Sequence, residues 1–142
     1  MEKFILTLFL VSLLANSILS SCPGCPGGLS DDDLHSDKLH QYTKVGVSKI
    51  YQKKLEENSL PSCIDLEGEL HSGTKQVVAG LKYVLKVHVK PIKSTNAECA
   101  ASNVDVNSVP TETCEIIIWE KPYNNLPENE RTEITFVCPA PA

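Results

Sequence analysis

A pair of cysteines near the start of the chain has the spacing of a redox centre. Cys22-Pro-Gly-Cys25 is a Cys-x-x-Cys motif, which in thioredoxin-like proteins lies between a strand and a helix that lower the thiol pKa. Here the motif lies in a Pro/Gly-rich segment, residues 22–28, with no strand before it and no helix beginning at it. Redox catalysis by these two cysteines is therefore disfavoured.

Histidine is the other residue type that could support metal binding or Cys/His catalysis. His35 and His40 are five positions apart and so lie on different sides of a helix. His71 precedes a predicted turn, and His88 falls on the polar face of a predicted strand. We interpret all four as solvated surface histidines, and we expect neither a metal site nor a cofactor.

The first 21 residues have the pattern of a secretory signal peptide. Lys3 precedes an apolar run, residues 4–15, and small residues follow up to Ser21. The run is shorter than a membrane-spanning helix requires, so we expect a secreted, extracellular protein without a membrane anchor. The rival interpretation is a bacterial lipobox ending at Cys22, but this would leave five cysteines for a disulfide-built domain.

Composition restricts the class of partner. The chain has a formal net charge of −5, and it lacks the lysine and arginine clusters that bind a polyanion, so nucleic acid is not an expected partner. An even number of cysteines, six, follows the leader, which in a short exported chain favours disulfides over free thiols. The length after residue 21 suits one compact domain, and we divide the chain into a leader (1–21), a flexible arm (22–30) and a single domain (31–142).

One helix is predicted at the start of this domain. Ser30 followed by three aspartates combines an oxygen-bearing cap with first-turn acids, which favours a helix start over the remote alternative of a calcium site. Apolar residues at helical spacing then predict one helix over 32–57, weakened in its middle by Gly46.

Strand patterns follow the helix. In residues 81–90 the odd positions are all apolar and the even positions are polar except Val84, which is the period of a half-buried strand. The other predicted strands and connections are a strand at 63–72, a turn at 73–80, a surface loop at 91–113, strands at 115–119 and 132–138, and a polar connection at 120–131. We expect an α+β fold, with one long helix packed across a four- to five-stranded antiparallel sheet.

A short motif lies at the mouth of the predicted hairpin. Gln76-Val77-Val78-Ala79-Gly80 directly precedes the alternating strand. It resembles the Gln-x-Val-x-Gly loop of the cystatins, reversible protein inhibitors of papain-like cysteine proteases.

Two flanking features strengthen this resemblance. Gly27-Gly28 lies ahead of the helix, where cystatins carry an N-terminal glycine, and Trp119-Glu-Lys-Pro122-Tyr123 lies where many of them carry Pro-Trp. All three features follow the order and approximate spacing of the family over the whole mature chain. Tyr123 departs from the family pattern, since it stands in place of tryptophan.

The resemblance implies a mechanism of inhibition without catalysis. A three-part wedge would occlude the protease cleft, with the arm at Gly27 and Gly28 in the non-primed subsites, the loop 76–80 near the catalytic cysteine, and Pro122-Tyr123 on the primed side. Papain-like cysteine proteases are thus the expected partners, and a monomer the expected state. The alternative is a secreted cystatin-fold binding protein without inhibitory activity.

Some cystatins also inhibit legumain through an asparagine after the helix. Asn58 falls near that place, although an asparagine that closes a helix is commonly a C-terminal cap.

The resemblance also bears on the disulfides. The segment from Cys114 to Cys138 looks like the cysteine-bounded last hairpin of secreted cystatins, which implies a bond between these two residues. The family's other bridge lies within the loop before that hairpin, where this chain has only Cys99. A cross-strand bond of Cys63 with Cys99 is geometrically reasonable. Cys22 and Cys25 are then left to each other or to another chain, and the fifteen connectivities that six cysteines allow stay open.

Overall fold

The alternating segment forms the centre of the sheet. The computed structural model describes residues 27–123 and 125–140, so the predicted leader, Cys22 and Cys25 lie outside the described residues. Within the described residues the sheet has the strand order β1-β2-β3-β4-β5, with all neighbours antiparallel. The strands are β1 (Gly27–Gly28), β2 (Ile64–Val78), β3 (Gly80–Lys93), β4 (Glu112–Glu120) and β5 (Thr132–Val137).

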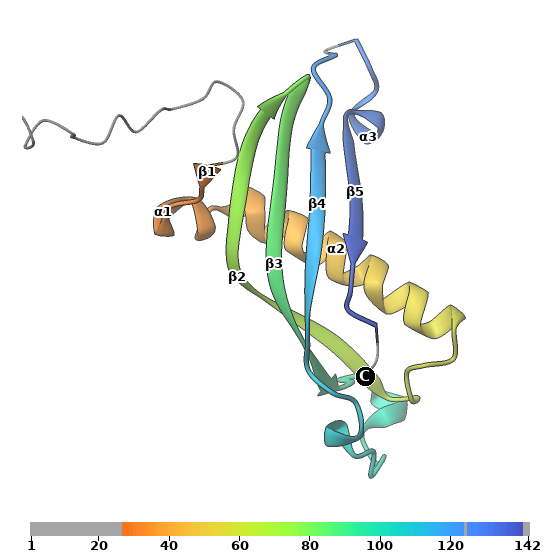
Figure 1. Ribbon diagram of the computed structural model, residues 1–142. Helices are drawn as coiled ribbons and strands as arrows, with labels where there is room; N and C mark the ends of the chain where they lie inside the picture. The colour runs from red at the N-terminus through yellow and green to blue at the C-terminus, as the bar shows by residue number, and fades with distance from the viewer. Residues whose placement is uncertain (1–26, 124, 141–142) are drawn as a thin grey trace, which may run out of the picture.

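One long helix crosses one face of this sheet (Figure 1). The helices are α1 (Asp31–Leu34), α2 (Asp37–Glu56) and α3 (Glu128–Arg131), and single 3-10 turns lie at Ala97–Cys99 and Val106–Ser108. In the described residues no helix is both long and apolar enough to cross a bilayer. The α+β architecture expected from the sequence is confirmed.

The core lies between α2 and the inner face of the sheet. The apolar positions of β3 from Tyr83 to Val89 are buried there, as the alternation predicted, and they pack with residues of α2 and β4. The helix approaches the sheet closely at Gly46, where an added Cβ would lie 2.4 Å from the Cδ1 atom of Ile116. This glycine therefore permits the contact between helix and sheet that buries the core.

The prediction of one unbroken helix over 32–57 is wrong at its start. Ser30 caps α1 in a capping box with Asp33, and a second serine, Ser36, begins α2 by accepting a hydrogen bond from the backbone N–H of Leu39. Two serine caps six residues apart each favour a new helix start, so the chain breaks at His35.

The connections between strands also differ from the prediction. The turn expected at 73–80 is wrong, because β2 continues to Val78 and only Ala79 separates it from β3. The strand β3 extends to Lys93, beyond the start of the loop predicted at 91–113. Proline has no backbone N–H to donate to a neighbouring strand. Pro91 is tolerated in β3 because β4 pairs with β3 only as far as Val89, so no β4 residue lies opposite Pro91 to accept that hydrogen bond.

Within the described residues, two disulfides fasten the strands of the sheet. Cys114 and Cys138 are joined with a Cα–Cα distance of 4.3 Å, and Cys63 and Cys99 with a Cα–Cα distance of 5.4 Å. Both expected pairs are confirmed. The first links the neighbouring ends of β4 and β5, and the second fastens the loop after β3 to the start of β2. Each restricts the unfolded chain and should contribute about 2–4 kcal/mol to stability.

Candidate functional site

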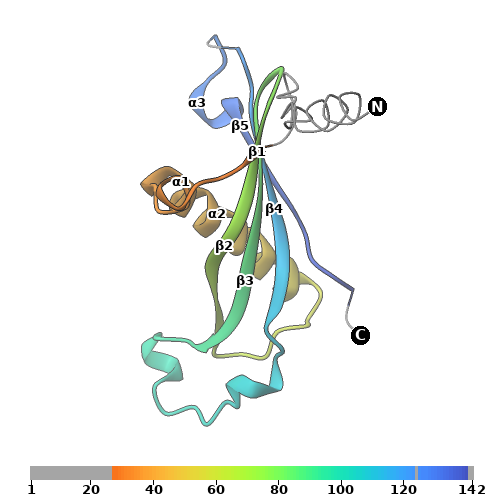
Figure 2. The same ribbon diagram turned by 60° about the vertical axis from the view of Figure 1, so that its left-hand side comes forward.

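Three of the predicted contact segments lie toward one end of the sheet. The turn between β2 and β3 and the connection that follows β4 stand beside each other at the top of both views, with β1 against the edge of β2 just below them (Figures 1 and 2). We call this the tip end, and define it by residues 27–28, 76–80 and 119–123. Segments almost a hundred residues apart in sequence thus form one edge of the molecule.

The β2–β3 turn presents apolar side chains to solvent. Val77 is 63% exposed and Val78 is 40% exposed, Ala79 is exposed as well, and Gln76 is half-buried. β-branched valines on a tight hairpin have few rotamers to lose, so this surface is rigid. Such a surface can be buried by a partner at a small entropic cost.

Gly80 is required by the geometry of this turn. Its φ is +93°, and an added Cβ would lie 2.0 Å from the backbone oxygen of Glu120. Any larger residue would strain the backbone and push the end of β4 away. A substitution of Gly80 therefore changes the shape of the tip end and is not a clean probe of binding.

Trp119 joins the two hairpins at the tip end. Its indole N–H donates a 2.8 Å hydrogen bond to the backbone oxygen of Ala79, and the ammonium of Lys121 lies 5.5 Å from the centre of its ring. The sequence indicated Trp119 as a neighbour of the Pro-Tyr segment but did not show that it holds the other turn. In the sequence, only the position of Trp119 three residues before Pro122 indicated that it belongs to this site.

Pro122 and Tyr123 follow as the exposed part of the second hairpin. Tyr123 is 59% exposed, and Pro122 approaches the position that a Cβ on Gly80 would occupy, at 3.2 Å. A backbone hydrogen bond of 2.8 Å from Lys121 to the oxygen of Arg131 closes the base of this connection. The two hairpins are therefore packed against each other, with their apolar side chains facing outward.

A polar cluster anchors the end of β4 to the long helix. The Tyr42 hydroxyl donates to Oε1 of Glu120 at 2.5 Å, and the Lys38 ammonium lies 2.5 Å from the same oxygen. Burial, followed by the hydrogen bond to Glu120, raises the pKa of Tyr42 to about 12. Because Glu120 is the last residue of β4, the cluster fixes the point at which the connection between β4 and β5 leaves the sheet.

The glycine pair lies beside the base of the turn. Gly27 pairs with Lys75 and Gly28 with Thr74, and the N–H of Leu29 donates to the oxygen of Gly73 at 3.0 Å. We expected these glycines in a flexible arm, whereas the structure has them as a short edge strand. The cause is the free edge of β2, which offers backbone partners. Both glycines are exposed, and an added Cβ at either would meet nothing within 4 Å.

The chain is similar to known proteins in its fold and not in its sequence. The sequence matches no family profile and no curated protein. Among solved structures, a chain of the inhibitory complex of human meprin beta with mouse fetuin-B matches over 83% of this chain, with 19% identity and a TM-score of 0.58. This protein covers 35% of that chain. Dimeric human cystatin F aligns over 89% of this chain and 94% of its own, with 20% identity and a TM-score of 0.47.

The chain has a cystatin-like fold. Asn58 ends the long helix of this fold with φ of +53°, and the N–H of Ser59 closes the turn on the oxygen of Lys54 at 2.9 Å. It is a left-handed helix cap away from the tip end, and its use against legumain stays a prediction.

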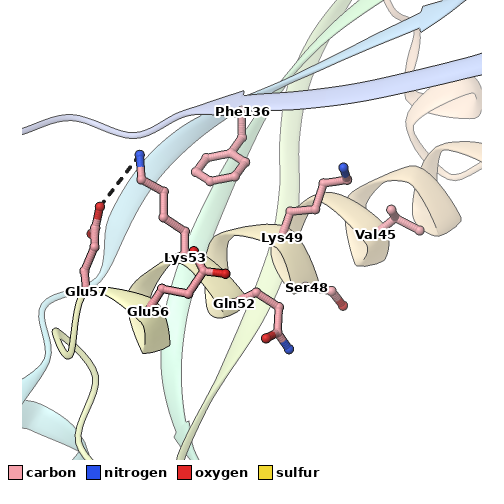
Figure 3. A pocket seen from close by; sticks show the side chains of 8 residues that line it. All are labelled: Val45, Ser48, Lys49, Gln52, Lys53, Glu56, Glu57 and Phe136. Atoms are coloured by element: carbon pink, nitrogen blue, oxygen red, sulfur yellow. Dashed lines mark ion pairs between the residues drawn. The ribbon is translucent and has the colours of Figure 1, made fainter.

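The hollow between α2 and β5 contains none of the predicted contact residues. It has a volume of about 490 Å³ and is lined by one side of α2, with Phe136 of β5 projecting toward the helix (Figure 3). Lys53 reaches along it, 3.9 Å from Glu57 and 5.6 Å from the centre of the Phe136 ring. These are solvated helix side chains, so the tip end remains the candidate site.

Proposed function

We propose that this protein is a secreted, monomeric, reversible inhibitor of papain-like cysteine proteases that acts by occluding the active-site cleft. The observation that carries the proposal is the gathering of Gly27-Gly28, the turn 76–80 and Pro122-Tyr123 at the tip end. The match to a chain of an inhibitory protease complex supports the same general class of activity. The two disulfides support an extracellular setting.

Inhibition would depend on a rigid surface that is complementary to the cleft. Val77 and Val78 would bury apolar area near the catalytic cysteine, and Tyr123 would pack on the primed side. Gly27 would allow the backbone beside β2 to approach the enzyme closely. No step of covalent chemistry is needed, since the wedge presents no bond that must be cleaved.

The hydrogen bond from Trp119 to Ala79 gives this surface its preorganisation. It ties the two hairpins together before binding, so the protease would not have to order them. The Tyr42 and Lys38 contacts to Glu120 do the same for the exit of the second hairpin. The expected consequence is that much of the affinity comes from low ordering cost rather than from a large interface.

The test is titration of the disulfide-intact mature chain, residues 22–142, against active papain and a cathepsin L-like enzyme. Saturable, reversible inhibition with one protein bound per active site is the expected result. No inhibition at micromolar protein would leave the alternative, a cystatin-fold binding protein without inhibitory activity. Meprin beta, the protein named in the matched inhibitory complex, serves as the comparison target, and inhibition of meprin beta alone would refute the papain-like assignment.

A further inference from the structure

Two histidine rings face each other on the side of the sheet opposite the long helix. The ring centres of His71 in β2 and His88 in β3 are 4.7 Å apart, at an interplanar angle of 50°. His88 follows the even, outward-facing positions of β3, and His71 is exposed. The pair is therefore open to ions from solvent.

A β-bulge brings the two rings together. Leu70 pairs with Val87 and Ser72 with Lys86, which leaves His71 as the extra residue of β2 without a partner opposite it. Bulges redirect the side chain that they carry and are often functional features of a sheet. The sequence alone placed His71 next to a turn, so the pair was not foreseen.

The surroundings of His88 prepare one of its nitrogens for metal binding. Its Nδ1 lies 2.9 Å from the hydroxyl oxygen of Thr113 in β4. When Nδ1–H donates to this oxygen, the ring is the tautomer whose Nε2 carries a free lone pair. A partner of this kind orients metal-bound histidines in proteins and sets their tautomer.

A carboxylate also lies on the face of the sheet that carries His88. Glu69 pairs directly across from His88 in the strand register, and its carboxylate lies 2.8 Å from the ammonium of Lys90. The Glu69 carboxylate therefore lies on the same face of the sheet as the imidazole of His88.

We propose that His71 and His88 form a surface site for a zinc-like divalent transition-metal ion. Each ring would supply one nitrogen at about 2.0–2.1 Å, water would complete a tetrahedral set, and Glu69 would favour the bound charge. Imidazole nitrogen suits zinc, copper and nickel better than it suits calcium or magnesium. His88 lies eight residues along β3 from Gly80, which is roughly 26 Å at strand spacing, so this site is separate from the tip end.

The test is calorimetric titration of the disulfide-intact, untagged chain with zinc chloride in a non-coordinating buffer at pH 7.5. We expect one ion per chain. His71→Ala and His88→Ala should each weaken binding by about tenfold or more, since either leaves only one imidazole. His35→Ala and His40→Ala are matched controls at α1 and α2 and should leave the affinity unchanged.

A positioning variant adds a second readout. Thr113→Val should weaken zinc binding by about tenfold and Thr113→Ser should restore it, because only the serine can hold Nδ1 of His88. Wild-type chain that does not bind at millimolar zinc would overturn the proposal. So would one-to-one binding that neither His71→Ala nor His88→Ala changes, because the ion would then lie elsewhere.

Discussion

Val77 offers the sharpest test of the proposed binding surface. Replacing valine by alanine removes two methyl groups, which at about 0.8 kcal/mol each are worth about 1.6 kcal/mol on full burial. In the free protein 63% of Val77 is exposed, so a protease that covered it completely would gain from that fraction. The variant should lose about 1 kcal/mol of binding free energy, or about fivefold in Ki.

The assay is steady-state inhibition of papain by wild type, Val77→Ala and Val137→Ala. Val137 is the matched control because it is 58% exposed and lies at the opposite end of β5 from the second hairpin. Both variants should keep a wild-type unfolding free energy to within about 0.5 kcal/mol, as surface substitutions do. A Val77→Ala Ki equal to wild type, or an equal loss in Val137→Ala, would refute the orientation of the wedge.

Three further predictions address the remaining contacts. Gly27→Leu should weaken papain inhibition by about tenfold by holding the enzyme away, with Tm unchanged because the site is open; an unchanged Ki would remove the arm from the interface. Trp119→Phe should lower the unfolding free energy in urea by about 1 kcal/mol through loss of its bond to Ala79; unchanged stability would contradict that bond. Wild-type stability should fall as pH rises from 10.0 to about 12, because Tyr42 ionises first in the unfolded chain; Tyr42→Phe should show a shallower fall, and equal slopes would contradict the assigned pKa.

The parts of the fold that sequence predicted best are those with one buried face. In β3 the inward positions from Tyr83 to Val89 had to be apolar to fill the core, so the alternation alone predicted which side chains face the helix. The bond between Cys114 and Cys138 came from resemblance, and the pairing of Cys63 with Cys99 from the expected neighbourhood of their strands. Both kinds of inference use patterns that can be recognised in a single sequence.

What escaped prediction depends on contacts between distant segments. Gly73 looked like the start of a turn, yet it continues β2 because β3 supplies a partner along the whole strand. The bulge at His71 has no local signature, since it is a mismatch in register between two strands. The bond from Trp119 to Ala79 likewise joins residues forty positions apart. The local structural preferences of the residues do not predict such pairings.

The short β1 leaves most of β2 as an open edge, and this has a consequence for self-association. Free strand edges attract other chains, and a second copy would pair most easily with an identical edge. Along the part of β2 that β1 does not cover, Asp65, Glu67 and Glu69 alternate on one face, and the bulge at His71 interrupts the ladder. Edge-to-edge pairing of two copies would bring these carboxylates together across a distorted backbone. We therefore expect the edge of β2 to resist pairing with a second copy more strongly than a flat, uncharged edge would.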